Sequence, residues 1–189
     1  MSYLASASSR TSIGTLKLIL TDYNREVLEV ATIPNLLLAW AARSDVPLSS
    51  GFIDLTNEIR DSFLHSLKDK HIACDIISGA WSPQFVDLLL SSSRLTGRDE
   101  VLIIACETIY SPDSVHQFTA TLVQILQAVS LAGSRPLALI ATKRVYFGVG
   151  GGLDDFLARL QEQGGQGQTV WQSQDGVRRD IVAVSLCNP

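Results

Sequence analysis

Short apolar runs alternate with stretches of helical periodicity along most of this chain. The runs that read as buried strands are Leu16–Leu20, Ile72–Ser78, Val101–Cys106 and one that begins at Leu137–Ala141. Apolar residues recur at helical spacing between these runs, for example over 25–42, where Pro34 interrupts the pattern, and over 57–68. This alternation is typical of βαβ units, so we predict an α/β fold with a mostly parallel sheet.

Two of the predicted helices open with a serine followed by a proline. In Ser82-Pro83 and in Ser111-Pro112 the hydroxyl can cap free amide groups, and proline is tolerated at the first helical position. The helix after Ser111 carries an apolar face typical of burial on one side: Val115, Phe118, Leu122, Ile125, Leu126 and Val129.

A glycine-rich phrase, Tyr-Phe-Gly-Val-Gly-Gly-Gly at 146–152, follows the strand that begins at Leu137–Ala141. We expect that strand to run to the phrase, where glycine allows a sharp turn and a close approach to the main chain. The phrase is not an intact G-x-G-x-x-G and comes late in the chain, which argues against a nucleotide phosphate loop. A nucleotide-binding oxidoreductase is therefore the weakest of the hypotheses.

The end of the chain predicts a reversal of strand direction. A helix marked by Leu153, Phe156, Leu157 and Leu160 follows the glycines and ends at Gly164-Gly165. Strands at Gln168–Gln172 and Arg179–Leu186 come next, joined by the Gln174-Asp175-Gly176 turn, whose Asp-Gly pair favours a hairpin. The sequence thus predicts a C-terminal antiparallel hairpin on an otherwise parallel sheet.

Composition limits the classes of protein to which the chain can belong. Its 189 residues are 46% apolar and 18% charged, which predicts one core-forming domain. A formal charge of −4 gives no electrostatic reason to expect nucleic acid or an anionic membrane as a partner. No apolar run approaches the roughly 18–20 residues that cross a bilayer, and the first ten residues lack the pattern of a secretory signal.

The cysteines and histidines form no recognisable ligand pattern. Cys74, Cys106 and Cys187 are odd in number and widely spaced, and we expect them to be small buried hydrophobes in a reducing compartment. The histidines are expected on the surface or on helix faces, without a metal: His65, His71 and His116.

The ends of the predicted strands carry the candidate functional residues, because ligands of open α/β sheets bind beyond the carboxyl ends of the strands. Asp22 can accept hydrogen bonds from ribose hydroxyls, or it can cap the following helix. Trp81 can stack on a purine, or it can belong to the core, which its type alone favours. Glu107 and Tyr110 either line a cleft or are an acidic residue at a helix start beside a packed tyrosine.

Taken together, these phrases resemble the seven-strand, S-adenosylmethionine-dependent class I methyltransferases, and most closely the protein-histidine N-methyltransferase branch. The matching phrases are Asp22-Tyr23-Asn24 with Val27-Leu28 and Thr32-Ile33-Pro34-Asn35, Ser78-Gly79-Ala80-Trp81-Ser82, Glu107-Thr108-Ile109-Tyr110 with Ser111-Pro112-Asp113, and Lys143 through Gly152. The resemblance covers about 16–187. Its most specific pieces are the acidic-x-x-Tyr motif and the Tyr-Phe-Gly-Val-Gly-Gly phrase.

The resemblance implies a Rossmann-like sheet and roles for particular residues. The cofactor S-adenosylmethionine would be bound by Asp22, Tyr23, Asn24, Trp81 and Glu107. Methyl transfer would take place beside Glu107 and Tyr110. The acceptor slot would be shaped by Tyr146, Phe147, Gly148 and Gly150.

The amino end departs from this family. Its members begin with a strand, a glycine-rich acidic loop and a helix, and this first βα unit is missing before Leu16, where Gly14 is the single glycine. The strand would lie between those of Asp22 and Glu107, and each buried backbone group that it leaves unpaired costs roughly 1–3 kcal/mol. We therefore expect a remnant segment at 1–15 and an incomplete methyltransferase domain at 16–189 that binds the cofactor weakly or not at all. Serine-rich residues 3–13 are a poor match for a replacement strand.

Two functional hypotheses follow. The first is a protein-histidine methyltransferase that acts on a large-subunit ribosomal protein in the cytoplasm, with some nuclear presence. The second is a non-catalytic interaction module derived from the same fold, in which the acceptor face binds a partner without chemistry. Neither requires contact with nucleic acid or a membrane.

Overall fold

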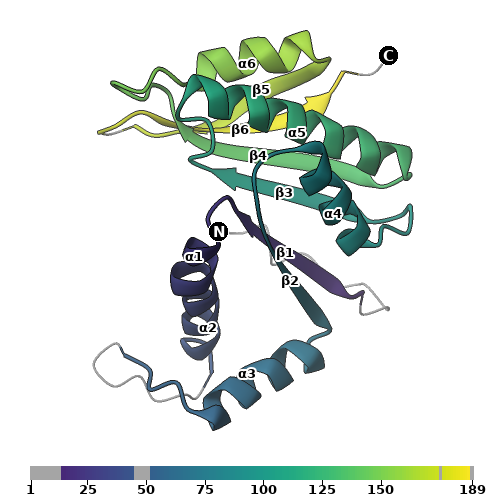
Figure 1. Ribbon diagram of the computed structural model, residues 1–189, viewed down its shortest axis with the longest axis vertical. Helices are drawn as coiled ribbons and strands as arrows, with labels where there is room; N and C mark the ends of the chain where they lie inside the picture. Colours follow the sequence, from purple (N-terminus) through teal and green to yellow (C-terminus); the bar gives the residue numbers. More distant parts are fainter. Residues whose placement is uncertain (1–13, 45–51, 175, 188–189) are drawn as a thin grey trace. The chain divides into compact units, whose positions relative to one another are not determined.

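The computed structural model describes residues 14–44, 52–174 and 176–187. The chain divides into two compact units, Met1–Gly79 and Ala80–Pro189, which are described one at a time (Figure 1). The single domain expected over 16–189 stays a prediction. Residues 3–13, most of the loop expected at 43–53, and Asp175 of the expected Gln174-Asp175-Gly176 turn lie outside the described residues.

The first unit is built on two parallel strands. Strand β1 (Leu16–Asp22) pairs with β2 (Ile72–Ser78) in a register that places Leu16 opposite Ile72 and Asp22 opposite Ser78. Helix α3 (Asn57–Asp69) precedes β2, and Thr56 caps it by accepting the N–H of Ile59. The predicted strand at Leu16–Leu20 is therefore confirmed and is two residues longer.

The interruption expected near Pro34 is confirmed as a change of helix type. The chain runs from α1 (Arg25–Val27) through a π-helical segment, η1 (Leu28–Thr32), into α2 (Ile33–Ala41). Proline has no N–H, and its ring clashes with the carbonyl group four residues earlier in an α-helix. Here that carbonyl belongs to Val30, inside the π segment, where the wider turn accommodates the ring.

The second unit contains a four-stranded sheet with the order β3-β4-β6-β5. Strand β3 (Glu100–Cys106) is parallel to β4 (Arg135–Lys143), whereas β6 (Arg179–Leu186) is antiparallel to both β4 and β5 (Gly165–Gln172). The predicted α/β class and the closing antiparallel hairpin are thus confirmed. The helices of this unit are α4 (Pro83–Ser93), α5 (Pro112–Leu131) and α6 (Leu153–Glu162).

Both predicted serine caps are present. The Ser82 hydroxyl accepts the N–H of Phe85 at 3.2 Å and begins α4. At α5 a capping box forms, in which Ser111 Oγ accepts the N–H of Ser114 at 3.2 Å and Ser114 Oγ accepts the N–H of Ser111 at 2.9 Å. These bonds satisfy donors that the first helical turn leaves free, and they fix the direction in which the chain leaves the end of β3.

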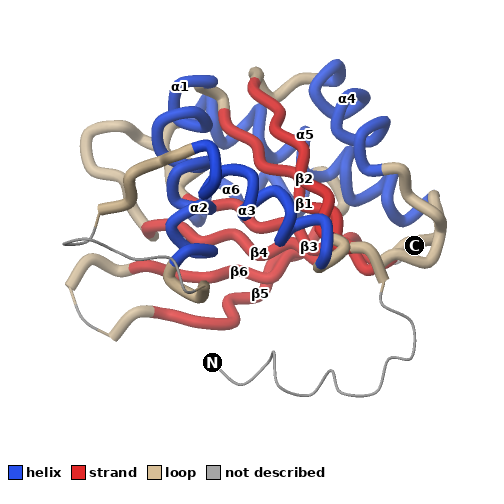
Figure 2. Tube along the Cα trace, turned by 90° about the horizontal axis from the view of Figure 1, so that it is seen from below, coloured by secondary structure: helices blue, strands red, loops and turns tan. Residues whose placement is uncertain are grey.

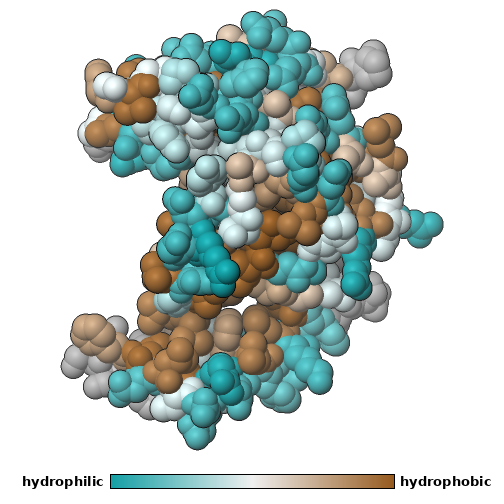
Figure 3. Space-filling view, in the orientation of Figure 1, coloured by the Kyte–Doolittle hydropathy of each residue, from teal (hydrophilic) through white to brown (hydrophobic). Residues whose placement is uncertain are grey.

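The core of the second unit lies between one face of the sheet and helices α5 and α6, which lie on that face in Figure 1. Figure 2 shows the strands in the order β3, β4, β6, β5. All six residues of the predicted apolar face of α5 are buried. Alternate residues of the strands reach the opposite face, where Leu102, Ile104 and Leu137 are about half exposed. Apolar residues accordingly appear at the surface in the space-filling view (Figure 3).

Two expectations, one about β4 and one about the cysteines, are wrong. Strand β4 ends at Lys143 and does not run to the glycine phrase, because an isolated antiparallel bridge between Val145 and Gly152 closes the phrase into a loop of its own. The cysteines are not all buried, since Cys106 and Cys187 are exposed and only Cys74 is partly covered. Cys106 alternates onto the open face of β3, and Cys187 lies beyond the end of β6.

Among the described residues, β1 pairs only with β2, and β3 pairs only with β4. Within the described ranges each is thus an edge strand of its own sheet. The missing strand expected between them from the sequence stays a prediction.

Candidate functional site

Glu107 lies at the carboxyl end of β3 in a strained backbone conformation. Its N–H donates to the carbonyl oxygen of Ala141 at 2.9 Å, which continues the ladder between β3 and β4. Its φ is 56°, in the left-handed region that costs a residue with a side chain about 1–2 kcal/mol. The turn directs the carboxylate away from the strand, toward the loop that follows β4.

Tyr146 connects that loop to Glu107. Its hydroxyl donates to Glu107 Oε2 at 2.9 Å and lies 2.9 Å from the hydroxyl of Thr142. The backbone N–H of Lys143 also donates to the Tyr146 oxygen, at 3.3 Å. Tyr146, the first residue of the glycine phrase, therefore hydrogen-bonds both to the end of β4 and to the Glu107 carboxylate, which follows β3.

Lys143 places a positive charge beside the same carboxylate. Its Nζ atom lies 3.7 Å from Glu107 Oε2 and 5.4 Å from the centre of the Tyr146 ring. The Glu107 side chain is 46% exposed and that of Lys143 is 36% exposed, so the pair is half open to water and its attraction is screened.

Partial burial raises the pKa of Tyr146 above its usual value of 10. The hydrogen bonds from Thr142 and from the backbone of Lys143 act in the opposite direction, and the negative charge of Glu107 adds to the increase. The phenol therefore keeps its proton at neutral and moderately alkaline pH and acts as a hydrogen-bond donor to the carboxylate.

The glycine phrase packs against the start of α5. A Cβ atom on Gly151 would lie 2.5 Å from the backbone nitrogen of Ser111 and 2.7 Å from the carbonyl oxygen of Tyr110. Only glycine allows this approach, which brings the phrase and the Glu107-x-x-Tyr110 motif together as the resemblance implied. Gly148 and Gly150 adopt left-handed φ values of 78° and 83° within the loop.

Two other aromatic residues are predicted for the site, Phe147 at the acceptor slot and Tyr110 beside the methyl-transfer centre. Phe147 is 92% exposed and Tyr110 is 50% exposed. Tyr146 thus contacts the carboxylate of Glu107, whereas the ring of the neighbouring Phe147 is exposed to solvent.

Asp22 ends β1 and caps the turn that follows. Its Oδ1 atom accepts the N–H of Asn24 at 2.8 Å, which agrees with the capping alternative. Its Oδ2 atom makes no hydrogen bond with any described residue and can still accept one from a ligand. Tyr23 is 61% exposed.

Trp81 packs with its own unit. Its ring lies edge-on to Phe85 at a centroid distance of 5.1 Å and to Phe118 at 5.7 Å, and it is partly buried against the main core. The core alternative therefore accounts for these contacts. Because the indole is only partly buried, stacking of its uncovered part on a purine stays a prediction.

Sequence reasoning missed two members of the site, Thr142 and Lys143. Both are the last residues of β4, where they lie opposite Asp180 and Arg179 at the start of β6. Their position at the carboxyl end of a predicted strand is the signal that could have identified them. Asp180 is 1% exposed; its Oδ1 accepts from Gln172 at 2.8 Å, and its Oδ2 has no hydrogen-bond partner among the described residues. Charged residues of β4 and β6 are therefore paired next to the loop that carries Tyr146.

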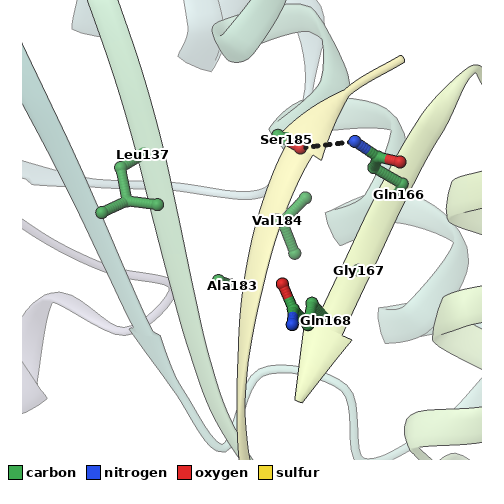
Figure 4. A pocket seen from close by; sticks show the side chains of 7 residues that line it. All are labelled: Leu137, Gln166, Gly167, Gln168, Ala183, Val184 and Ser185. Atoms are coloured by element: carbon green, nitrogen blue, oxygen red, sulfur yellow. Dashed lines mark hydrogen bonds between the residues drawn. The ribbon is translucent and has the colours of Figure 1, made fainter. Parts of the chain in front are cut away.

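A shallow pocket lies elsewhere on the sheet and includes none of the predicted site residues. It is formed across β4, β6 and β5, where Gln166 donates to Ser185 at 3.2 Å (Figure 4). Within the described ranges, no three histidine, cysteine or acidic side chains are grouped as a metal would require. None of the helices described is both long and apolar enough to span a membrane.

Comparison with known proteins gives a consistent result. The chain is 32% identical over 163 residues to histidine protein methyltransferase 1 of Saccharomyces cerevisiae, a match that covers 78% of this chain and 42% of the yeast protein. It is 34% identical over 148 residues to the Schizosaccharomyces pombe protein of that name, and 28% identical over 182 residues to the Bos taurus homolog. These matches cover 77% and 93% of this chain, and 41% and 44% of the relatives. No protein-family model matches. The chain thus spans less than half the length of these relatives.

Proposed function

Because this chain is a sequence relative of the histidine protein methyltransferases over most of its length, we propose that it carries protein-histidine N-methyltransferase function, with S-adenosylmethionine as the methyl donor. The observation that carries the proposal is the hydrogen bond from Tyr146, in the glycine-rich loop, to the carboxylate of Glu107. The same loop packs on the start of α5. The carboxylate and the loop both belong to the second unit, and both coincide with the phrases on which the resemblance was based.

The chemistry of Asp22 is compatible with the ribose of the proposed donor. Oδ1 is used by the N–H of Asn24, and Oδ2 is available to accept a ribose hydroxyl. The exposed ring of Tyr23 and the backbone of Asn24 would lie beside it, and Trp81 would contribute its uncovered ring edge to the adenine. When bound, S-adenosylmethionine supplies a methyl group activated by a positively charged sulfur.

The acceptor requires orientation more than acid–base help. A free imidazole has a pKa of about 6.5, so at neutral pH most histidine side chains carry a nucleophilic lone pair. A carboxylate that accepts the ring N–H holds the other nitrogen in a fixed direction, and alignment of this kind contributes several kcal/mol to a transfer reaction. Glu107 is the proposed orienting group, and Tyr110 and Phe147 would contact the surrounding peptide.

The proposed partner is a large-subunit ribosomal protein, met in the cytoplasm or the nucleus. The test is incubation of the protein with ribosomal extract and methyl-labelled S-adenosylmethionine, followed by amino-acid analysis of the labelled band. Methylhistidine in the wild-type reaction, and its loss with Glu107→Ala, would support the proposal. Cofactor binding by titration calorimetry without any transfer would contradict it as stated.

A second candidate function is supported by the exposed apolar face of the second unit. Leu102 and Ile104 of β3 are more than half exposed there and present surface that a protein partner can cover. If this non-catalytic alternative holds, ribosomal proteins will be retained by the immobilised chain without methylation, and Leu102→Ser with Ile104→Ser will reduce that retention.

A further inference from the structure

The hydrogen-bond directions around Tyr146 can be assigned from the chemistry of its partners. A carboxylate only accepts hydrogen bonds, so the single hydroxyl proton of Tyr146 goes to Glu107 Oε2. The contact with Thr142 at 2.9 Å then requires that Thr142 donate to the phenol oxygen, and the same proton is shared with the carbonyl oxygen of Lys143, which lies 3.1 Å from the Thr142 hydroxyl. The backbone N–H of Lys143 is a second donor to that oxygen. The phenol oxygen thus receives two hydrogen bonds and donates one.

This arrangement treats the two carboxylate oxygens of Glu107 differently. Oε2 is held by the Tyr146 hydroxyl at 2.9 Å and faces the ammonium group of Lys143 at 3.7 Å. Oε1 makes no hydrogen bond with any residue in the described part of the chain. One oxygen is therefore fixed by the protein, and the other is left as an acceptor at the exposed side of the site.

A neutral imidazole has one N–H donor and one lone pair on the opposite ring nitrogen. If the N–H binds Oε1, the lone pair points away from Glu107 and stays free to attack. The direction of that lone pair then depends on the angle of the carboxylate plane. That plane is set by the contact at Oε2, because the Glu107 side chain is otherwise half exposed and free to rotate.

We propose that Tyr146 is a positioning residue: its hydroxyl, itself held by Thr142 and the backbone of Lys143, fixes Glu107 so that Oε1 receives the N–H of the acceptor histidine. This inference rests on the proposed function. It assigns Tyr146 a role different from that of lining the acceptor slot, and it adds Thr142 and Lys143 to the site.

The first experiment tests the network in the free protein. Tyrosine labelled with ¹³C at the ring carbon that bears the hydroxyl is titrated by NMR, and the Tyr146 signal is identified by its loss in Tyr146→Phe. The expected result is a Tyr146 pKa above 10 in the wild type and a lower value in Glu107→Gln, because the Glu107 charge raises it. Other charged groups face this region from Lys143 on β4 and from Asp180 and Arg179 on β6. An unchanged pKa in Glu107→Gln would overturn the proposed contact.

The sign of the pH dependence follows from the same shift. Because the pKa in the folded protein is raised above that of the unfolded chain, the contribution of Tyr146 to stability is fully present below pH 10. It is lost as the pH rises through the folded-state pKa, when the phenolate and the carboxylate repel each other. The difference in stability between the wild type and Tyr146→Phe should therefore diminish only above pH 10.

The second experiment tests the acceptor role without requiring turnover. Binding of N-acetyl-histidine methylamide and of N-acetyl-alanine methylamide is measured by NMR shifts at pH 8, where the imidazole is neutral. The wild type should prefer the histidine probe. Tyr146→Phe should reduce that preference about tenfold, the usual effect of losing one hydrogen bond to a charged group, and Thr142→Val should reduce it about threefold, as for a bond between neutral groups. Thr119→Val is the matched control, because its buried hydroxyl bonds only to the carbonyl of Val115.

The outcomes separate the two proposals. If the wild type shows no preference for the histidine probe, the proposed function fails at this site and the inference fails with it. If the wild type prefers histidine and Tyr146→Phe keeps that preference in full, the inference is overturned while the proposed function stands. Loss of the preference in Tyr146→Phe and Thr142→Val, with Thr119→Val unaffected, supports both.

Discussion

The contact between the glycine phrase and the start of α5 makes Gly151→Ala the most informative single substitution for the site. The new Cβ atom would lie 2.5 Å from the Ser111 nitrogen and from the carbonyl carbon of Tyr110, and 2.7 Å from the Tyr110 oxygen. All three atoms belong to the backbone, so no side chain can rotate to relieve the overlap. An ordinary carbon contact requires about 3.5–4.0 Å. The loop or the first turn of α5 must therefore move by roughly 1 Å.

The expected cost has two contributions. Overpacking of a well-packed site typically costs about 1–3 kcal/mol. Displacement of Ser111 also weakens the capping box that it forms with Ser114, which is worth about 1 kcal/mol. The sum is about 2–4 kcal/mol, and for a protein of this size each kcal/mol lowers the unfolding midpoint by roughly 2–4 °C.

Thermal unfolding followed by circular dichroism measures this effect. Gly14→Ala is the control for a glycine with open space, because no atom lies within 4 Å of its Cβ position, and it should change stability by less than about 0.5 kcal/mol. Gly148→Ala also has open space but a φ of 78°, so it isolates the cost of backbone strain, about 1 kcal/mol. If Gly151→Ala unfolds at the same temperature as Gly14→Ala, the loop does not pack on α5 as described.

The remaining predictions concern the core, one helix end and the thiols. Leu126→Ala should destabilise the protein by about 2–5 kcal/mol in urea titrations, because Leu126 is fully buried, whereas Leu131→Ala, at 89% exposure, should have little effect; equal effects would place the core elsewhere. Arg94→Gly should raise stability by roughly 1 kcal/mol, since Arg94 ends α4 with a φ of 51°, and a decrease would contradict the strain argument. Cys106 should be alkylated faster than Cys74 in mass-spectrometric time courses, because burial raises the pKa of the Cys74 thiol and Cys106 is exposed; the reverse order would refute this.

Much of the fold was predictable because periodicity reports on burial. The strand at Ile72–Ser78 has the predicted bounds, and the helix after Ser111 buries the predicted face. The end of β4 was not predictable in the same way. Val145 and Tyr146, both of types that favour strands, follow Lys143 and Arg144, and only the bridge from Val145 to Gly152, seven residues later, shows that the strand has already ended.

The contacts within the candidate site could not be predicted from the sequence. Glu107 and Tyr146 were both identified, but their hydrogen bond joins positions 39 residues apart, and no local pattern encodes it. The sequence paired Glu107 with Tyr110 because the two are close in the chain. In the structure Tyr110 contributes its backbone to the packing of Gly151, and Tyr146 contributes the hydroxyl.

The left-handed conformation of Glu107 differs in its setting from those of the other residues with positive φ. Of the non-glycine residues described, those with positive φ are His71, Arg94 and Glu107. His71 and Arg94 follow the ends of α3 and α4, where a left-handed residue terminates a helix. Glu107 follows a strand, its N–H still belongs to the ladder, and the strain is balanced only by half-exposed contacts to Tyr146 and Lys143. Glycine at this position would relieve the strain and cost the chain little stability. Under the proposed function the direction of this carboxylate orients the acceptor, so Glu107→Gly should keep or raise the unfolding midpoint while abolishing the preference for the histidine probe. A clear drop in the midpoint would contradict the strain argument.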